Sequence, residues 1–161
     1  MDFKRFLLLT FCVVGFYVPG VAQQQQPQQL PDFEFYQLNA KPFTKKDLQK
    51  NKTSIFILFD TGCDHCQKQI PVIGKQYSNF QNSAFYFVSF NERNQITDFM
   101  KTYGKDLNGK QNVVLLQDRN RMFLPTFFPT KFPAVFMYSP KGKLVYYRSG
   151  DHDVNQLVKA S

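Results

Sequence analysis

One stretch decides the fold: SIFILFDTGCDHCQKQIP, from Ser54 to Pro71. Its first half is a nearly continuous apolar run of β-branched and aromatic residues, which is typical of a strand buried on both faces. From Cys63 onward the apolar residues follow helical spacing. Two cysteines, Cys63 and Cys66, therefore stand where a buried strand gives way to a helix. They could be a redox pair, a structural disulfide or part of a metal site.

The chain opens with a segment typical of an export signal. MDFKR carries positive charge, the uncharged run FLLLTFCVVGFYV follows, and the small residues Gly20 and Ala22 lie where a signal peptidase cuts. The apolar run is too short for a comfortable membrane span. We interpret residues 1–22 as a cleaved signal peptide and expect a periplasmic or extracellular protein without stable membrane insertion. The alternative is an uncleaved N-terminal anchor.

Signal cleavage would leave two of the three cysteines. It removes Cys12 and keeps Cys63 and Cys66. An exported protein meets an oxidising compartment, where these two thiols could pair only with each other within the chain.

The rest of the chain divides into a lead-in and one domain. Residues 23–31, QQQQPQQLP, are polar and uncharged, and we expect them to be flexible. Residues 32–161 have the length of a single domain.

Hydrophobic periodicity predicts an α/β fold with a mixed sheet and helices on both faces. We expect strands at residues 33–38, 53–60, 84–90, 112–118, 134–139 and 143–150. We expect helices from Cys63 to about Phe80, over residues 94–103, and from Asp153 onward. The last two strands flank a Pro140-Lys141-Gly142 turn and should form a hairpin.

This order gives the two cysteines different environments. Cys63 should lie at the start of a helix, where free backbone N–H groups and the helix dipole stabilise a thiolate and make the thiol more reactive. Cys66, one turn later on the same face, should be less exposed. Cys63 could then attack a partner disulfide while Cys66 resolves the mixed disulfide.

The two other interpretations explain less. A structural disulfide between Cys63 and Cys66 would close a very short loop, which stabilises a fold by only about 2 kcal/mol. A structural zinc usually has four ligands, and beyond the cysteines the sequence offers His65 and the remote His152. Two alternatives remain: a metal-binding or metallochaperone module that uses Cys63, Cys66 and a histidine, and an interaction domain with an inert disulfide.

Two separated segments resemble the thioredoxin superfamily, and most closely the exported thioredoxin-like oxidoreductases of the TlpA class. The first is SIFILFD leading into CDHCQKQIP, in which Pro71 stands five residues after the second cysteine. The second is FPAVFMYSPKGKLV, in which a proline opens a strand before a glycine-containing turn and a hairpin partner. The resemblance implies a thioredoxin fold and a thiol–disulfide oxidoreductase. Its partners would be protein thiols or disulfides and a redox partner protein, with no metal or organic cofactor.

The resemblance also implies a role for the second segment. Pro133 should carry a cis peptide bond after Phe132 and lie beside the two sulfurs. The backbone before it could pair with an extended peptide, so Phe132 and Pro133 are predicted substrate-binding residues. The alternative is that Pro133 merely begins a strand.

Three positions depart from the family pattern. Gly62 replaces an aromatic residue, while Ile57 and Gln69 replace carboxylates that accept the proton of the resolving thiol. The proton acceptor for Cys66 is therefore left open. Asp60 could take that role or could cap the turn.

The residues between the cysteines should tune the first thiol. Asp64 opposes a thiolate at Cys63, whereas His65 favours it when protonated or donating a hydrogen bond. The two effects oppose each other, so the direction of electron flow is left open.

Charge and aromatic content add two weaker indications. The net charge is +8, but the basic residues are scattered, which does not indicate nucleic-acid binding and is compatible with a mild, unspecific attraction to acidic partners or anionic surfaces. The segment RMFLPTFFPTKFP concentrates Met122, Phe123, Phe127, Phe128 and Phe132, which could be core residues or an apolar rim around the sulfurs. We expect a monomer.

Overall fold

The computed structural model describes residues 25–161. A seven-stranded mixed sheet lies at its centre, in the order β2-β1-β5-β4-β3-β6-β7. Its strands are β1 (Glu34–Gln37), β2 (Pro42–Thr44), β3 (Thr53–Leu58), β4 (Ser83–Ser89), β5 (Val113–Gln117), β6 (Ala134–Tyr138) and β7 (Leu144–Ser149).

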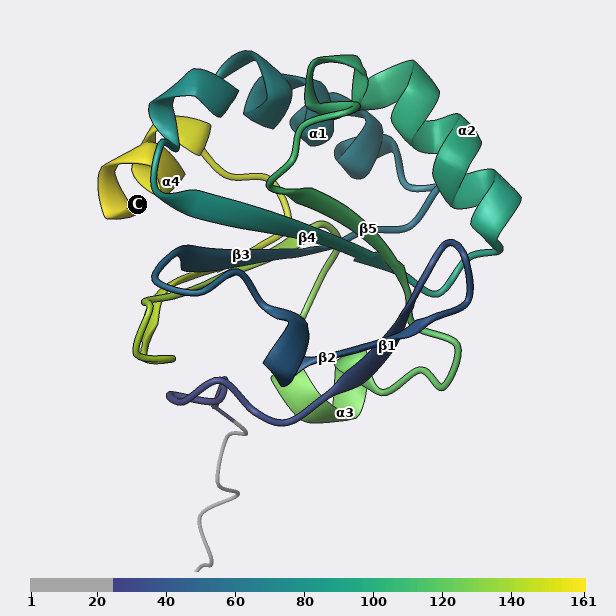
Figure 1. Ribbon diagram of the computed structural model, residues 1–161. Helices are drawn as coiled ribbons and strands as arrows, with labels where there is room; N and C mark the ends of the chain where they lie inside the picture. Colours follow the sequence, from purple (N-terminus) through teal and green to yellow (C-terminus); the bar gives the residue numbers. More distant parts are fainter. Residues whose placement is uncertain (1–24) are drawn as a thin grey trace, which may run out of the picture.

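Helices cover both faces of this sheet, as predicted. The α-helices are α1 (Asp64–Lys75), α2 (Arg93–Tyr103), α3 (Phe123–Phe127) and α4 (Val154–Ala160). Short 3-10 helices are η1 (Lys45–Asp47), η2 (Tyr77–Asn79) and η3 (Lys105–Leu107). In Figure 1, α1, α2 and α4 lie above the sheet and α3 lies below it.

Strand β3 is an interior strand of the sheet, between β4 and β6. It pairs in parallel with β4 and antiparallel with β6, so that Leu58 lies opposite Ala134. Alternate β3 side chains enter the two cores: Ile55 and Ile57 face α1 and α2, and Phe56 faces the α3 side. A strand covered on both faces has no polar face, which explains the continuous apolar run in the sequence.

The core on the α3 side is strongly aromatic. Phe123 and Phe127 are fully buried and stack with ring centroids 4.2 Å apart. These two side chains of the phenylalanine-rich segment are core residues. Met122 and Leu124, from the same segment, are instead 46% and 40% exposed.

Besides the short 3-10 helices η1 and η3, two elements were not predicted, and each of these two has a tertiary cause. The five-residue helix α3 begins where the buried carboxylate of Asp118 accepts hydrogen bonds from the backbone N–H groups of Met122 (2.9 Å) and Phe123 (2.8 Å). The three-residue edge strand β2 forms by pairing with β1 and is too short to carry a periodic pattern.

The lead-in differs from the expected flexible segment. Leu30 is 5% exposed, and its N–H donates to Gly142 O (2.7 Å), while Leu144 N–H donates to Gln28 O (2.9 Å). Leu30 supplies the apolar side chain that the glutamines lack, and the β6–β7 turn supplies backbone partners. The predicted signal peptide and Cys12 lie outside the described residues. Within residues 25–161, no helix has the length and apolar character needed to cross a membrane.

Candidate active site

A tight turn joins β3 to α1 and positions the first cysteine. Asp60 holds this turn, because its Oδ1 accepts a hydrogen bond from Gly62 N–H (2.7 Å) and its carbonyl accepts one from Cys63 N–H (3.2 Å). Asp60 therefore has the turn-capping role that was one of its two predicted roles.

Cys63 is the N-cap residue of α1. Its Sγ accepts a hydrogen bond from the backbone N–H of Cys66 at 3.3 Å. A helix N-terminus has unpaired N–H groups and a positive dipole end, and both favour negative charge on the sulfur. Both cysteines are free thiols; Cys63 is half-buried and Cys66 is completely buried. The predicted difference in exposure is present.

The second thiol holds its proton more tightly than an ordinary cysteine. Burial is the largest cause that raises the pKa of Cys66, followed by its hydrogen bond with Cys63. The negative charges of Cys63 and Asp60 also raise this pKa, while a hydrogen bond from the Asp60 backbone acts in the opposite direction. Cys66 must therefore lose a proton before it can attack Cys63.

His65 has a partner that the sequence did not indicate. Its Nδ1 lies 2.8 Å from each carboxylate oxygen of Asp151, in the loop between β7 and α4. Both side chains are more than half exposed. The two residues are 86 positions apart, so no local pattern links them. Asp64, the other residue between the cysteines, is exposed on the first turn of α1.

The same loop contacts α1 a second time. Gln69 Nε2 donates to the carbonyl of His152 at 2.6 Å. His152 Nδ1 lies 3.0 Å from Gly150 O, and because a carbonyl only accepts, Nδ1 carries a hydrogen. Among the described residues, His152 Nε2, Gln69 Oε1 and Tyr146 OH are buried without a protein partner. Gln69, where the family pattern has a carboxylate, thus joins α1 to the loop between β7 and α4.

The Phe132–Pro133 peptide bond is cis, as the resemblance implied. Pro133 directly precedes Ala134, which lies opposite Leu58 at the end of β3. The proline therefore lies at the sheet end where the turn to Cys63 begins. The Phe132 ring packs edge-on against Phe90, with centroids 5.7 Å apart. Both Phe132 and Cys63 pack against the same core as α1.

The described residues do not assemble a metal centre. Within residues 25–161, no three side chains of His, Cys, Asp or Glu are grouped as ligands of one ion. The Nδ1 atoms of His65 and His152 already have other partners. The metal-binding alternative thus has no ligand set in this part of the chain.

Comparisons with known proteins agree with this geometry. The model of the AhpC/TSA family matches residues 27–147. Thiol-disulfide oxidoreductase ResA of Bacillus subtilis (strain 168) is 26% identical over 167 residues, which cover 95% of this chain and 89% of ResA.

Solved structures share the fold. The thioredoxin domain of a thiol-disulfide oxidoreductase from Bacteroides vulgatus superposes with a TM-score of 0.64 at 25% identity, covering 85% of this chain and 97% of that chain. StoA from Bacillus subtilis superposes with a TM-score of 0.63 at 16% identity, covering 83% and 98%. The predicted thioredoxin fold is confirmed.

Proposed function

The chain belongs to the AhpC/TSA family, and from this premise we propose that it is a thiol–disulfide oxidoreductase that exchanges electrons with cysteines of partner proteins through Cys63 and Cys66. One observation carries the proposal: a half-buried sulfur caps a helix and accepts the N–H of a second, fully buried cysteine one turn later. That arrangement supplies an accessible nucleophile with a resolving thiol behind it.

The proposed reaction with a partner disulfide has two steps. The Cys63 thiolate attacks one partner sulfur, forms a mixed disulfide and displaces the other partner sulfur as a thiolate. Cys66 then loses its proton and attacks Cys63 Sγ, which closes the Cys63–Cys66 disulfide and releases the second partner thiolate. The partner is reduced by two electrons and the chain is oxidised by two. The reverse sequence oxidises a partner dithiol, and the relative potentials of chain and partner set the direction.

Neighbouring residues have supporting roles in this proposal. His65 and Asp64 adjust the charge near Cys63. Phe132 and Pro133 lie at the sheet end where the turn to Cys63 begins, where an extended partner segment can pair with the chain. We infer further that the protein acts in the periplasm or outside the cell, because residues 1–22 are typical of an export signal.

Partner trapping tests the function. In a Cys66→Ser variant the second step is blocked, so mixed disulfides with partner proteins should accumulate and disappear on treatment with dithiothreitol. The matched control is Cys63→Ser, which keeps one thiol but lacks the exposed nucleophile and should trap far less. The unmodified chain should also reduce insulin disulfides when supplied with dithiothreitol. Equal trapping by both variants, with no insulin reduction, would contradict the proposal.

A further inference from the structure

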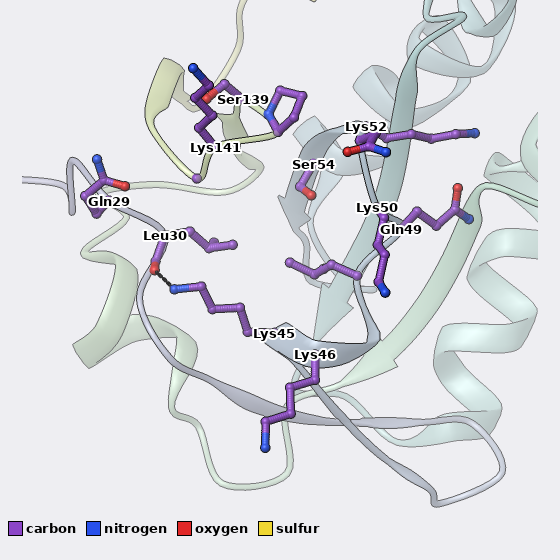
Figure 2. A pocket seen from close by; sticks show the side chains of 14 residues that line it. Gln29, Leu30, Lys45, Lys46, Gln49, Lys50, Lys52, Ser54, Ser139 and Lys141 are labelled. Carbon is purple, nitrogen blue, oxygen red and sulfur yellow. Dashed lines mark hydrogen bonds between the residues drawn. The ribbon is translucent and has the colours of Figure 1, made fainter.

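A lysine-lined pocket lies at the end of the sheet away from the cysteines. Its walls are η1 with the following loop, the start of β3, the β6–β7 turn, and Gln29 with Leu30. Five lysines line it: Lys45, Lys46, Lys50, Lys52 and Lys141. Figure 2 shows these side chains on the walls of the pocket, with the Lys45 amine directed at the Leu30 carbonyl and the Lys46 and Lys52 side chains extending outward. Among the described residues that line this pocket there is no aspartate or glutamate.

The pocket carries an excess of positive charge. Two carboxylates lie near it. Asp32 is 3.9 Å from the Lys45 amine. The pKa of Asp47 is lowered by its hydrogen bonds with the backbone and hydroxyl of Thr44, so Asp47 stays ionised there. Within residues 25–161, the other four lysines of the pocket form no ion pair. An anionic ligand would therefore meet at least three uncompensated ammonium groups.

The pocket and the cysteines lie at opposite ends of the same two strands. β3 starts beside the pocket at Thr53 and ends beside the turn to Cys63. β6 runs the other way, from Pro133 to the turn that contains Lys141. Six residues of strand span about 20 Å. A ligand in the lysine pocket therefore leaves Cys63 accessible.

The chain also enters the fold at this pocket. Gln29 and Leu30 form part of its wall, and the apolar run of the export segment ends at Val18. The ten residues between them, 19–28, span at most about 35 Å when fully extended. In the alternative in which residues 1–22 are kept as an uncleaved anchor, and during export before cleavage, the lysine pocket is thus tethered within that distance of the membrane surface. This favours a membrane surface over a soluble polyanion as the ligand.

We propose that the lysine pocket binds the anionic phospholipid headgroups of a membrane surface and turns the cysteine end away from the bilayer, toward partner proteins. Each lysine near an anionic bilayer strengthens binding about fivefold, and salt screens the attraction within about 10 Å. The interaction is with the surface and requires no insertion.

Vesicle binding tests this proposal on the full chain, in the processed form that the producing cell yields. Binding is measured by co-sedimentation with phosphatidylcholine vesicles that contain about one third phosphatidylglycerol, and with vesicles of phosphatidylcholine alone. The pocket variant replaces Lys45, Lys46, Lys50, Lys52 and Lys141 by Gln. The matched control has the same net charge and replaces five exposed lysines elsewhere, Lys75, Lys101, Lys105, Lys110 and Lys159, by Gln.

We expect the unmodified chain to prefer the anionic vesicles and to lose this preference at about 0.5 M salt. The pocket variant should bind them at least about tenfold more weakly than the control variant. Equal losses in both variants would mean attraction by net charge alone and would overturn the proposal. Tighter binding of the pocket to soluble polyphosphate than to anionic vesicles would overturn it as well, in favour of a soluble polyanion.

Two further measurements keep the test decisive. Insulin reduction at the unmodified rate shows that each variant is folded, and it separates a failure here from a failure of the proposed function. If the variant with five substitutions does not fold, Lys50→Glu with Lys141→Glu reverses the charge at two exposed positions and should weaken anionic binding similarly. A fluorophore on Cys63 should be quenched by a soluble quencher and not by a lipid-bound one; the opposite result would overturn the orientation.

Discussion

At the scale of single residues, one substitution can distinguish the two roles considered for Asp60, a cap of the turn and a proton acceptor for Cys66. Its carboxylate caps the turn before Cys63, and its negative charge is one of the causes that raise the pKa of the Cys66 thiol. A charge that holds the proton on Cys66 slows resolution, whereas a proton acceptor at the same position would speed it. The sign of the effect of one substitution therefore distinguishes the roles.

We expect Asp60→Asn to accelerate resolution two- to threefold. The amide oxygen still accepts the Gly62 N–H, while loss of the charge lowers the pKa of Cys66 and raises its thiolate fraction, an effect of about 0.5 kcal/mol. In both proteins the rate should rise about tenfold per pH unit between about pH 6 and 9, because burial keeps the pKa of Cys66 above its ordinary value. Single-turnover kinetics with a mixed disulfide measure this rate. A fall of about 100-fold would instead identify Asp60 as the proton acceptor.

The contact of His65 with Asp151 gives a second prediction at this scale. A protonated His65 near Cys63 favours the thiolate and hence the reduced form, so His65→Ala should lower the reduction potential. Asp151 offsets part of this charge, and both side chains are more than half exposed, so an effect of about 0.5 kcal/mol is expected, or roughly 10 mV for a two-electron couple. Redox titration against glutathione measures it. An unchanged potential would leave His65 with no tuning role.

At the scale of elements, the loop between β7 and α4 holds the cysteine helix at two points. His65 and Gln69 are four residues apart on α1, and they contact Asp151 and the carbonyl of His152. Residues at this spacing share a helix face, so one loop can reach both. The sequence identified the helix, the loop and the last helix separately, but their contact depends on tertiary packing that no local pattern records.

Helix α3 shows how one side chain can define an element. Asp118 is 1% exposed and accepts two backbone N–H groups at the start of α3. Asp118→Ala leaves the buried Phe123 N–H and the partly buried Met122 N–H without this partner and should lower the free energy of unfolding by about 2 kcal/mol. Urea denaturation measures this. The control is Asp98→Ala, whose carboxylate pairs only with exposed Lys101 and should cost about 0.5 kcal/mol or less. Equal losses would contradict the capping role.

At the scale of the whole molecule, the parts that could be predicted are those with long periodic patterns. The apolar runs located β3, β4 and β6, and helical spacing located α1 and α2. The elements that were missed are short or depend on distant partners, as α3 does on Asp118. The site divides in the same way. The two cysteines and the cis proline were predicted from local motifs. The contact of Asp151 with His65 and the lysine pocket form only when segments far apart in the sequence meet.

The disulfide itself gives a prediction about the stability of the whole fold. If Cys63 and Cys66 are a redox pair, closing a four-residue loop restricts the unfolded chain very little, and the model based on chain entropy allows about 2 kcal/mol. A domain of this size has a total stability of roughly 5–15 kcal/mol, so the reduced protein should remain folded. The melting temperatures of the oxidised and reduced forms should then differ by less than about 8 °C. Calorimetry in the presence and absence of dithiothreitol measures both, with Cys63→Ser as the control that dithiothreitol should not affect. Unfolding of the reduced form at a much lower temperature would identify the pair as a structural disulfide, because a redox enzyme must keep its fold in both states of its cycle.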